Sequence, residues 1–202
     1  MNAATVYLVD DDEAVRGGLR ALLAAEGLAV QAHADAQSFL DRCPADAAGC
    51  LLLDVNMPGL SGLDLQARLR TQGITLPVIM LTGCASVPAA VQALKAGAVD
   101  FLEKPCDADR LLTVVRAALT LDRQQREQRQ VRLAAQDRLA QLTAREHEIL
   151  RGLTQGHANK RIAYDLGISE RTVEQHRASV LRKCGVRTVA ELLNVVGSAG
   201  NG

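Results

Sequence analysis

The sequence predicts an α/β domain built on a doubly wound, five-stranded parallel sheet, followed by a small all-α domain of four helices. Two observations predict this fold class. Over residues 5–120, short apolar runs alternate with amphipathic stretches, as in parallel sheets covered by helices. From Leu142 onward, apolar residues recur at helical spacing alone. We expect domains at 1–121 and 139–202 with a linker at 122–138, which suits a chain of 202 residues.

Five apolar runs are predicted to be strands buried on both faces of the sheet. They are Val6–Val9, Leu28–Gln31, Cys50–Leu53, Val78–Leu81 and Val99–Leu102. Helices are expected at 14–25, 36–41, 62–72, 87–96 and 108–120. Three of these helices stop at a glycine (Gly27, Gly73 or Gly97), which readily takes the left-handed conformation past a helix end. Ser61 and Ser86 are expected to cap two helix starts.

The segment 122–138 consists almost entirely of helix formers with polar side chains. We expect a helical linker that continues from the last helix of the α/β domain. A disordered charged tether is the alternative.

The C-terminal segment carries explicit helix signals. Thr143 and Glu146 are spaced as a capping box, which opens a helix that ends at Gly156. Further helices are expected at 159–166, from the cap Ser169 to about Cys184, and at 188–196. The two middle helices and the glycine-containing turn between them have the spacing of a helix-turn-helix.

Charge is divided unevenly along the chain. Residues 1–122 carry 15 acidic and 9 basic side chains, whereas residues 123–202 carry 8 acidic and 14 basic ones. The acidic half suggests a cation-dependent site and the basic half an anionic partner, although scattered solvated charges would look similar.

The five cysteines are scattered and never spaced as CxxC. This pattern argues against a disulfide framework or a zinc site, and it suits a reducing cytoplasm. No apolar run of the chain approaches the roughly 20 residues that span a bilayer. No secretory signal opens the chain, so we expect a cytoplasmic protein without a membrane partner.

Polar side chains follow four of the predicted strands. They are Asp10, Asp11 and Asp12 after the first strand, Asp54 after the third, Thr82 after the fourth and Lys104 after the fifth. Strand carboxyl ends meet at one edge of such a sheet, and converging carboxylates need a cation, for which oxygen ligands favour Mg²⁺. Asp54 is predicted to be a nucleophile that forms an aspartyl phosphate, with Thr82 and Lys104 facing the phosphoryl oxygens. Residues that merely end strands are the alternative.

The segments VYLVDDDEAVR, LLLDVNMPGLSGLDL, PVIMLTG and AGAVDFLEKP resemble the receiver domain of bacterial response regulators. The resemblance implies a flavodoxin-like sheet in the strand order 2-1-3-4-5. It implies that a sensor histidine kinase phosphorylates Asp54, and that Asp10, Asp11, Asp54 and the backbone carbonyl of Asn56 hold Mg²⁺. Asp12 is less clearly a ligand.

The same resemblance implies further roles near the site. Thr82 and Phe101 would repack on phosphorylation, Lys104 would contact the phosphoryl group, and the Lys104–Pro105 bond would be cis. Val91, Lys95 and Arg110 would lie on the surface that forms the phosphorylated dimer. The sequence departs from FixJ-like relatives at Cys84–Ala85–Ser86, where His and an acidic residue are usual, and at Cys106, where Phe is usual.

The predicted helix 169–184 has two faces. Val173, Val180, Leu181 and Cys184 are expected to face the core. A second stripe, Arg171, Glu174, Gln175, Ala178 and Arg182, offers partners for guanine, cytosine, adenine and the thymine methyl group. Phosphate contacts are expected from Asn159, Lys160, Thr172, His176, Arg177 and Lys183. An ordinary solvated helix face is the alternative for each residue.

Residues 142–193, LTAREHEILRGL through VAELL, resemble the LuxR-type helix-turn-helix. The whole chain is similar to FixJ- and NarL-type regulators, and nearer to the first. Many relatives have Lys in place of Glu174 and some in place of Ala178, so readout should depend less on charge here. The resemblance implies a transcription regulator that binds double-stranded promoter DNA as a phosphorylated homodimer, with RNA polymerase as a further partner. It is not expected to be an enzyme beyond its own phosphoryl transfer and slow dephosphorylation.

Two other functions compete with this interpretation. A phosphoaspartyl hydrolase would need its nucleophile and its acid–base Asp two residues apart after the first strand, whereas Asp54 follows the third. A regulator gated by partner binding, without phosphate, stays open as the second alternative.

Overall fold

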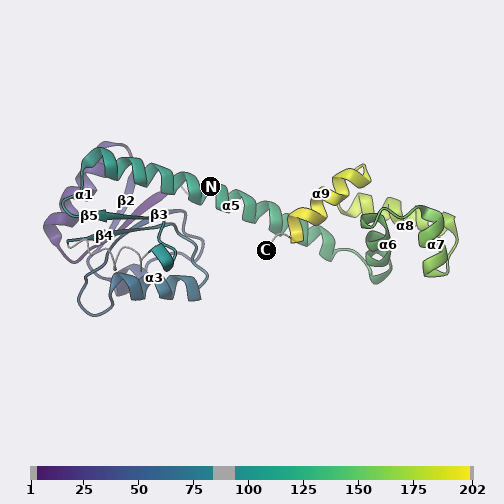
Figure 1. Ribbon diagram of the computed structural model, residues 1–202, viewed down its shortest axis with the longest axis horizontal. Helices are drawn as coiled ribbons and strands as arrows, with labels where there is room; N and C mark the ends of the chain where they lie inside the picture. Colours follow the sequence, from purple (N-terminus) through teal and green to yellow (C-terminus); the bar gives the residue numbers. More distant parts are fainter. Residues whose placement is uncertain (1–3, 84–93, 201–202) are drawn as a thin grey trace. The chain divides into compact units, whose positions relative to one another are not determined.

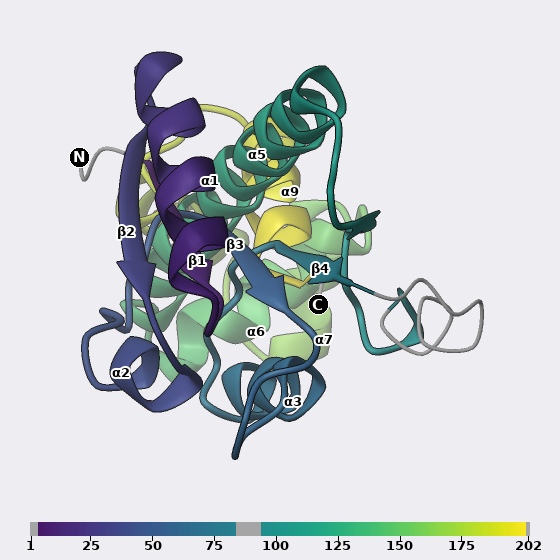
Figure 2. The same cartoon turned by 90° about the vertical axis from the view of Figure 1, so that its left-hand side faces the viewer.

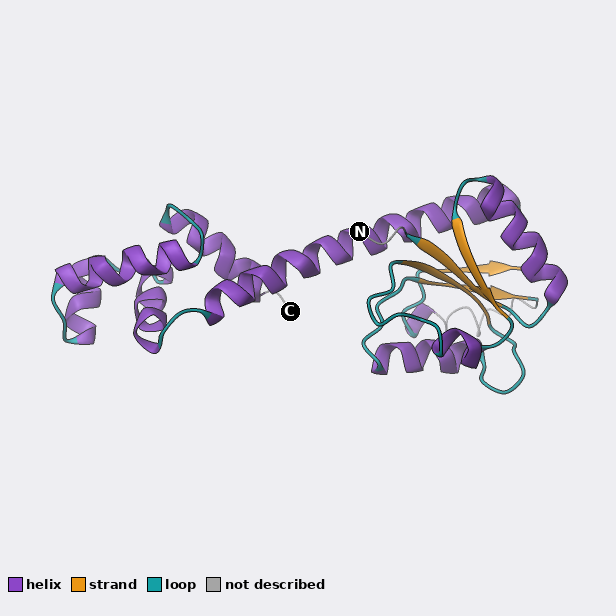
Figure 3. Ribbon diagram, turned by 180° about the vertical axis from the view of Figure 1, so that it is seen from behind, coloured by secondary structure: helices purple, strands orange, loops and turns teal. Residues whose placement is uncertain are grey.

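The computed structural model describes residues 4–83 and 94–200. The chain divides into two compact units, Met1–Gln125 and Arg126–Gly202. Over the described ranges, strands occur in the first unit and the second is entirely helical (Figure 3). An α/β domain followed by a small all-α domain of four helices is therefore confirmed.

A parallel sheet of five strands, in the order β2-β1-β3-β4-β5, forms the centre of the first unit. Its strands are β1 (Thr5–Val9), β2 (Ala29–His33), β3 (Gly49–Asp54), β4 (Val78–Thr82) and β5 (Asp100–Glu103). β1 lies between β2 and β3, with Val9 paired to His33 on one side and to Leu53 on the other. This confirms the expected strand order, and it places the carboxyl ends of β1 and β3 next to each other.

Helices cover both faces of the sheet (Figures 1 and 2). Helices α1 (Glu13–Ala25) and α5 (Ala108–Ala140) lie on one face, and α2 (Ala36–Leu40) and α3 (Gly62–Thr71) lie on the other. Alternate residues of β3 supply the two cores, because successive strand side chains point to opposite faces. Leu52 packs with Leu23 and Leu111 on the first face, while Leu53 packs with Phe39 and Leu65 on the second. The helix expected at 87–96 lies mostly outside the described residues.

Strand β2 differs from the prediction. His33 is buried, but Ala29, Gln31 and Ala32 are exposed, so this strand is not buried on both faces as expected. β2 is an edge strand with β1 as its one strand neighbour. Its small and polar side chains suit that exposed position, and the prediction of a fully buried strand was wrong here.

Helix α5 runs without a break from Ala108 to Ala140. The segment 122–138 is therefore helical in the structure rather than a disordered tether. Val131 and Leu133, the apolar interruptions of this segment, are exposed.

The second unit contains α6 (Ala144–Thr154), α7 (Asn159–Leu166), α8 (Glu170–Lys183) and α9 (Val189–Gly200). The capping box of Thr143 and Glu146 is present, and Ser169 caps α8, as predicted. Apolar residues of all four helices share one core, which includes Ile149, Ile162, Val173, Val180 and Leu192. Helices α6 and α7 approach closely at Gly152, where a Cβ atom would lie 2.7 Å from the Ile162 side chain.

Among the described residues, no helix is both long enough and apolar enough to cross a membrane.

Candidate functional site

The carboxyl ends of β1, β3, β4 and β5 bring together four of the predicted site residues. Asp10 and Thr82 are fully or almost fully buried, and Asp54 is 4% exposed. The Lys104 ammonium lies 2.5 Å from Asp10 Oδ2 and 3.0 Å from Asp54 Oδ1, so it bridges the two carboxylates. Residues that are 94 positions apart in the sequence thus form one polar site at the sheet edge.

The donor set of this site fits a hard divalent cation. Carboxylate oxygens of Asp10, Asp11 and Asp54 lie within 4.8 Å of one another. Oxygen ligands are those that Mg²⁺ prefers, and three carboxylates exceed the charge that one lysine can balance. Asn56 follows two residues after Asp54 with an exposed side chain.

Electrostatics distinguish Asp54 from an ordinary surface carboxylate. Burial raises the pKa of Asp54, Lys104 opposes this rise, and the charges of Asp10 and Asp11 add to it, with a net increase. For Lys104, partial burial lowers the pKa, but hydrogen bonds and ion pairs with Asp10 and Asp54 outweigh it and raise the pKa. Lys104 is therefore a firmly protonated cation beside a carboxylate that is more basic than usual.

Two residues next to the site have structural contacts that clarify their roles. Asp12 Oδ1 accepts hydrogen bonds from the backbone N–H groups of Ala14 (2.8 Å) and Val15 (3.2 Å), so Asp12 is the N-cap of α1. Arg16 donates a hydrogen bond of 2.8 Å to the backbone carbonyl of Asp10. Arg16 was not among the residues predicted for the site, because its contact with a backbone carbonyl six residues earlier leaves no signal in the sequence.

The residues predicted for the switch and the dimer surface lie in separate environments. Phe101 is half-buried against the core under α3, and the Lys104–Pro105 bond is cis. Val91 lies outside the described residues, whereas Lys95 is exposed. The guanidinium of Arg110 is 3.0 Å from Asp100 Oδ2, so it already has a partner within the first unit.

Helix α8 has the two faces that the sequence predicted. Val173, Val180 and Cys184 are fully buried, and Leu181 packs against the same core. All five members of the second stripe, Arg171, Glu174, Gln175, Ala178 and Arg182, are exposed. One face of α8 is thus free to enter a DNA groove.

The residues predicted for phosphate contacts are less uniform. Lys160 is exposed on α7. Arg177 donates a hydrogen bond of 3.2 Å to Asn159 Oδ1, which links α8 to α7. Thr172 shares a hydrogen bond of 2.8 Å with the cap Ser169, and His176 is half-buried.

Lys183 holds α8 against α6. Its ammonium lies 2.6 Å from Glu146 and also donates a hydrogen bond of 3.2 Å to the backbone carbonyl of Gln141. Glu146 additionally accepts from Ser179 (2.7 Å) and from the backbone N–H of Thr143 (2.8 Å). The Lys183 and Thr143 hydrogen bonds, with smaller help from Ser179, hold the pKa of the buried Glu146 at about 2. Lys183 is thus engaged inside the domain, which favours a structural role over the expected phosphate contact.

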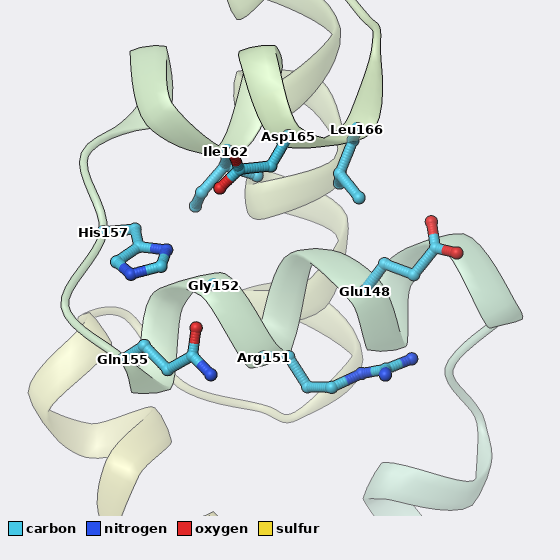
Figure 4. A pocket seen from close by; sticks show the side chains of 8 residues that line it. All are labelled: Glu148, Arg151, Gly152, Gln155, His157, Ile162, Asp165 and Leu166. Carbon is cyan, nitrogen blue, oxygen red and sulfur yellow. The ribbon is translucent and has the colours of Figure 1, made fainter.

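The second unit also has a groove of about 340 Å³ between α6 and α7 (Figure 4). It is lined by Glu148, Arg151, Gly152, Gln155, His157, Ile162, Asp165 and Leu166. Glu148 pairs with Arg145 and Asp165 pairs with Arg161, so both carboxylates of the groove are balanced. None of the lining residues belongs to α8 or to the predicted DNA contacts, which separates this groove from the candidate DNA-binding face.

Fold and site together define a regulator that joins a receiver domain to a DNA-binding helix-turn-helix. The model of the response regulator receiver domain matches residues 6–116, and that of the luxR family of bacterial regulatory proteins matches residues 140–196. The chain belongs to the two-component response regulators that carry a LuxR-type DNA-binding domain.

Similar proteins match over nearly the whole chain. The transcriptional regulatory protein FixJ of Azorhizobium caulinodans is 46% identical over 195 residues, which cover 96% of this chain and 92% of FixJ. DctR of Rhodobacter capsulatus, a C4-dicarboxylate transport transcriptional regulatory protein, is 44% identical over 190 residues, which cover 93% of this chain and 96% of DctR. The solved structure of the response regulator StyR has a TM-score of 0.89 at 38% identity, covering 97% of this chain and 99% of StyR. The solved structure of full-length FixJ from B. japonicum has a TM-score of 0.60 at 39% identity, covering 99% of this chain and 98% of FixJ.

Proposed function

We propose that a sensor histidine kinase switches this transcription regulator by phosphorylating Asp54. The observation that carries the proposal is the bridging position of Lys104 between the buried carboxylates of Asp10 and Asp54. An ion pair that served stability alone would need one carboxylate, whereas Lys104 bridges two. Carboxylate oxygens of Asp10, Asp11 and Asp54 also lie within 4.8 Å of one another. The excess negative charge is suited to a cation and an incoming phosphoryl group.

The proposed chemistry is a phosphoryl transfer between side chains. A carboxylate oxygen of Asp54 forms the new O–P bond while the P–N bond to the kinase histidine breaks, and the electron pair returns to the imidazole. Lys104 and Thr82 stabilise the phosphoryl oxygens by an ion pair and a hydrogen bond. Asp10, Asp11, Asp54 and the backbone carbonyl of Asn56 would hold Mg²⁺, which supplies positive charge for the phosphoryl oxygens.

The two ends of the chain have separate roles in this proposal. Residues 1–121 form the receiver and residues 139–202 bind promoter DNA, with 122–138 as the helical linker. Thr82 and Phe101 repack around the phosphoryl group, and the surface of Val91, Lys95 and Arg110 then forms a homodimer. Each α8 reads bases through its exposed stripe, and RNA polymerase is the further partner. The receiver catalyses its own phosphorylation and slow dephosphorylation, and we assign it no other reaction.

The test is the molar mass in solution with Mg²⁺, measured by light scattering with and without beryllofluoride as an aspartyl-phosphate mimic. Wild-type protein is expected to shift from monomer to dimer, and Asp54→Asn is expected to stay monomeric. Asp41→Asn, which changes an exposed carboxylate at the C-cap of α2, is the matched control and should behave as wild type. An Asp54→Asn protein that dimerises normally would contradict the proposal and favour gating by a partner instead.

A further inference from the structure

A further buried carboxylate of the receiver lies away from the proposed phosphoacceptor site. Asp122, on α5, is 4% exposed and accepts a hydrogen bond of 2.9 Å from the backbone N–H of Gly49. Gly49 is the first residue of β3 and is paired with Thr5, the first residue of β1. Asp122 therefore lies at the amino ends of the strands, whereas Asp54 lies at a carboxyl end.

One partner of Asp122, the backbone N–H of Gly49, belongs to a tightly packed part of the sheet. Gly49 has a φ of 135°, which favours glycine, and a Cβ atom there would overlap the backbone carbonyl of Thr5. Gly49 is thus packed against the backbone of β1 at the start of β3, so its N–H belongs to the centre of the sheet. A carboxylate is buried at this place only with such a donor, because an unpaired buried charge is strongly unfavourable.

Asp122 is also the last buried side chain of α5 within the first unit. Residues 123–134 of the same helix are all exposed or half-buried, and the next buried residue is Ala135 in the second unit. The helix is nevertheless continuous from Ala108 to Ala140. The attachment of α5 to the receiver sheet consequently ends at Asp122.

We propose that Asp122 is a positioning residue that fixes the rotation and axial place of α5 where the helix leaves the receiver. With this end anchored, a rearrangement at Asp54 and Phe101 that shifts the receiver part of α5 is transmitted along the same helix to its linker part, residues 122–138. Without the anchor, the receiver end of the linker frays and absorbs the rearrangement. The coupling part of this inference rests on the proposed function, whereas the anchoring part does not.

Three variants of the full-length chain test the anchor. Asp122→Ala removes the acceptor, whereas Asp122→Asn keeps an acceptor oxygen but removes the charge. Asp137→Asn, which changes an exposed carboxylate on the same helix, is the control. Amide hydrogen exchange in unphosphorylated protein is measured first. We expect exchange at residues 118–126 to be roughly tenfold faster or more in Asp122→Ala, less affected in Asp122→Asn and unchanged in Asp137→Asn. Wild-type exchange rates in a folded Asp122→Ala would overturn the anchor. If Asp122→Ala does not fold, Asp122→Asn decides in its place.

The second readout is the gain in DNA affinity caused by beryllofluoride, on a sequence that the wild-type protein selects from a random library. Asp122→Ala is expected to bind beryllofluoride as wild type does, because Asp54 is at the other end of the sheet, yet to lose most of the gain in affinity. A full gain would overturn the coupling role. If wild-type protein itself shows no gain, the proposed function fails, and the exchange rates still decide whether Asp122 anchors the helix.

Discussion

In each of the two domains a partly exposed lysine pairs with a buried carboxylate, and the two sites are built in opposite ways. In the helical domain, Glu146 receives hydrogen bonds from Lys183, Ser179 and Thr143, and its pKa is held at about 2. In the receiver, Lys104 is shared between Asp10 and Asp54, and the pKa of Asp54 is raised. Three donors converge on the one carboxylate of Glu146, whereas the carboxylates of Asp10 and Asp54 share one ammonium.

This difference separates an interaction that stabilises a fold from one that is suited to chemistry. A carboxylate surrounded by donors is fixed in its charged form and gains nothing from a new ligand. A carboxylate that competes with neighbouring carboxylates for one cation is stabilised when a metal or a phosphoryl group arrives. We therefore expect the receiver site to stabilise its fold less than the Glu146 site does, as is common where activity and stability compete.

The largest expected effect comes from breaking the satisfied pair. Glu146→Gln leaves the Lys183 charge without its partner and should lower the free energy of unfolding of the helical domain by about 3 kcal/mol. Urea titration followed by amide exchange in α6 and α8 measures this domain separately from the receiver.

The matched control for this variant is Glu148→Gln, which changes a second glutamate of the same helix, α6. Glu148 pairs with Arg145 at 2.6 Å, but both side chains are about one-third exposed. The loss should be about 1 kcal/mol or less, as for other exposed ion pairs. Equal losses in the two variants would show that burial does not distinguish them.

The next effect concerns two lysines that the sequence alone could not tell apart. Lys160 is exposed, whereas Lys183 is engaged by Glu146. Lys160→Ala should weaken binding to all DNA sequences alike and reduce the slope of log K against log salt by about one unit. Lys183→Gln should leave this slope unchanged and destabilise the domain instead.

Base readout provides the comparison for these phosphate contacts. Arg171→Ala or Gln175→Ala should relax sequence preference, with a loss of about 1–3 kcal/mol confined to the preferred site. Binding titrations on the selected sequence and on single-base variants of it measure this discrimination. Uniform losses from Arg171, Gln175 and Lys160 variants would contradict the assigned readout face.

The fold could be predicted from sequence wherever local signals agreed with the tertiary position. The capping box at Thr143 and the cap at Ser169 located α6 and α8, because helix starts depend on nearby hydrogen bonds. Strand β2 was mistaken for a buried strand, since its position at the sheet edge depends on which strands pair with it. Periodicity alone carries no information about that pairing.

The site could be predicted to the extent that topology determines it. In a doubly wound sheet the strand ends must converge, so Asp10, Asp54 and Lys104 could be expected to meet. The partners of Lys183 and of Asp122 could not be predicted, because each contact joins groups that are far apart in the sequence and meet only through the packing of the fold. A lysine on an amphipathic helix has the same local pattern whether it meets a phosphate or a buried glutamate.

The smallest expected effect is a change in the free energy of unfolding of Asp54→Asn. Its sign tests the contrast between the Asp54 and Glu146 sites most directly. Asp54→Asn removes a carboxylate whose raised pKa makes its charged form unfavourable in the folded receiver. The variant should therefore lose phosphorylation yet unfold with a free energy about 0.5–1 kcal/mol higher than wild type at neutral pH.

The pH dependence of the two domains should follow the same signs. The stabilising contribution of Glu146 is complete above its ordinary pKa of 4.5 and is lost as the pH falls from there toward about 2. The contribution of ionised Asp54 to stability has the opposite sign, because the pKa of Asp54 lies above the ordinary value of 3.8 in the folded receiver. Its unfavourable contribution is present at neutral pH and disappears as the pH falls through the folded-state pKa.

Segment-resolved amide exchange of wild type, Glu146→Gln and Asp54→Asn between pH 3 and pH 7, corrected for intrinsic exchange rates, measures both contributions. If Asp54→Asn were less stable than wild type at pH 7, the receiver site would be a structural pair like that of Glu146, and the contrast between the two domains would fail.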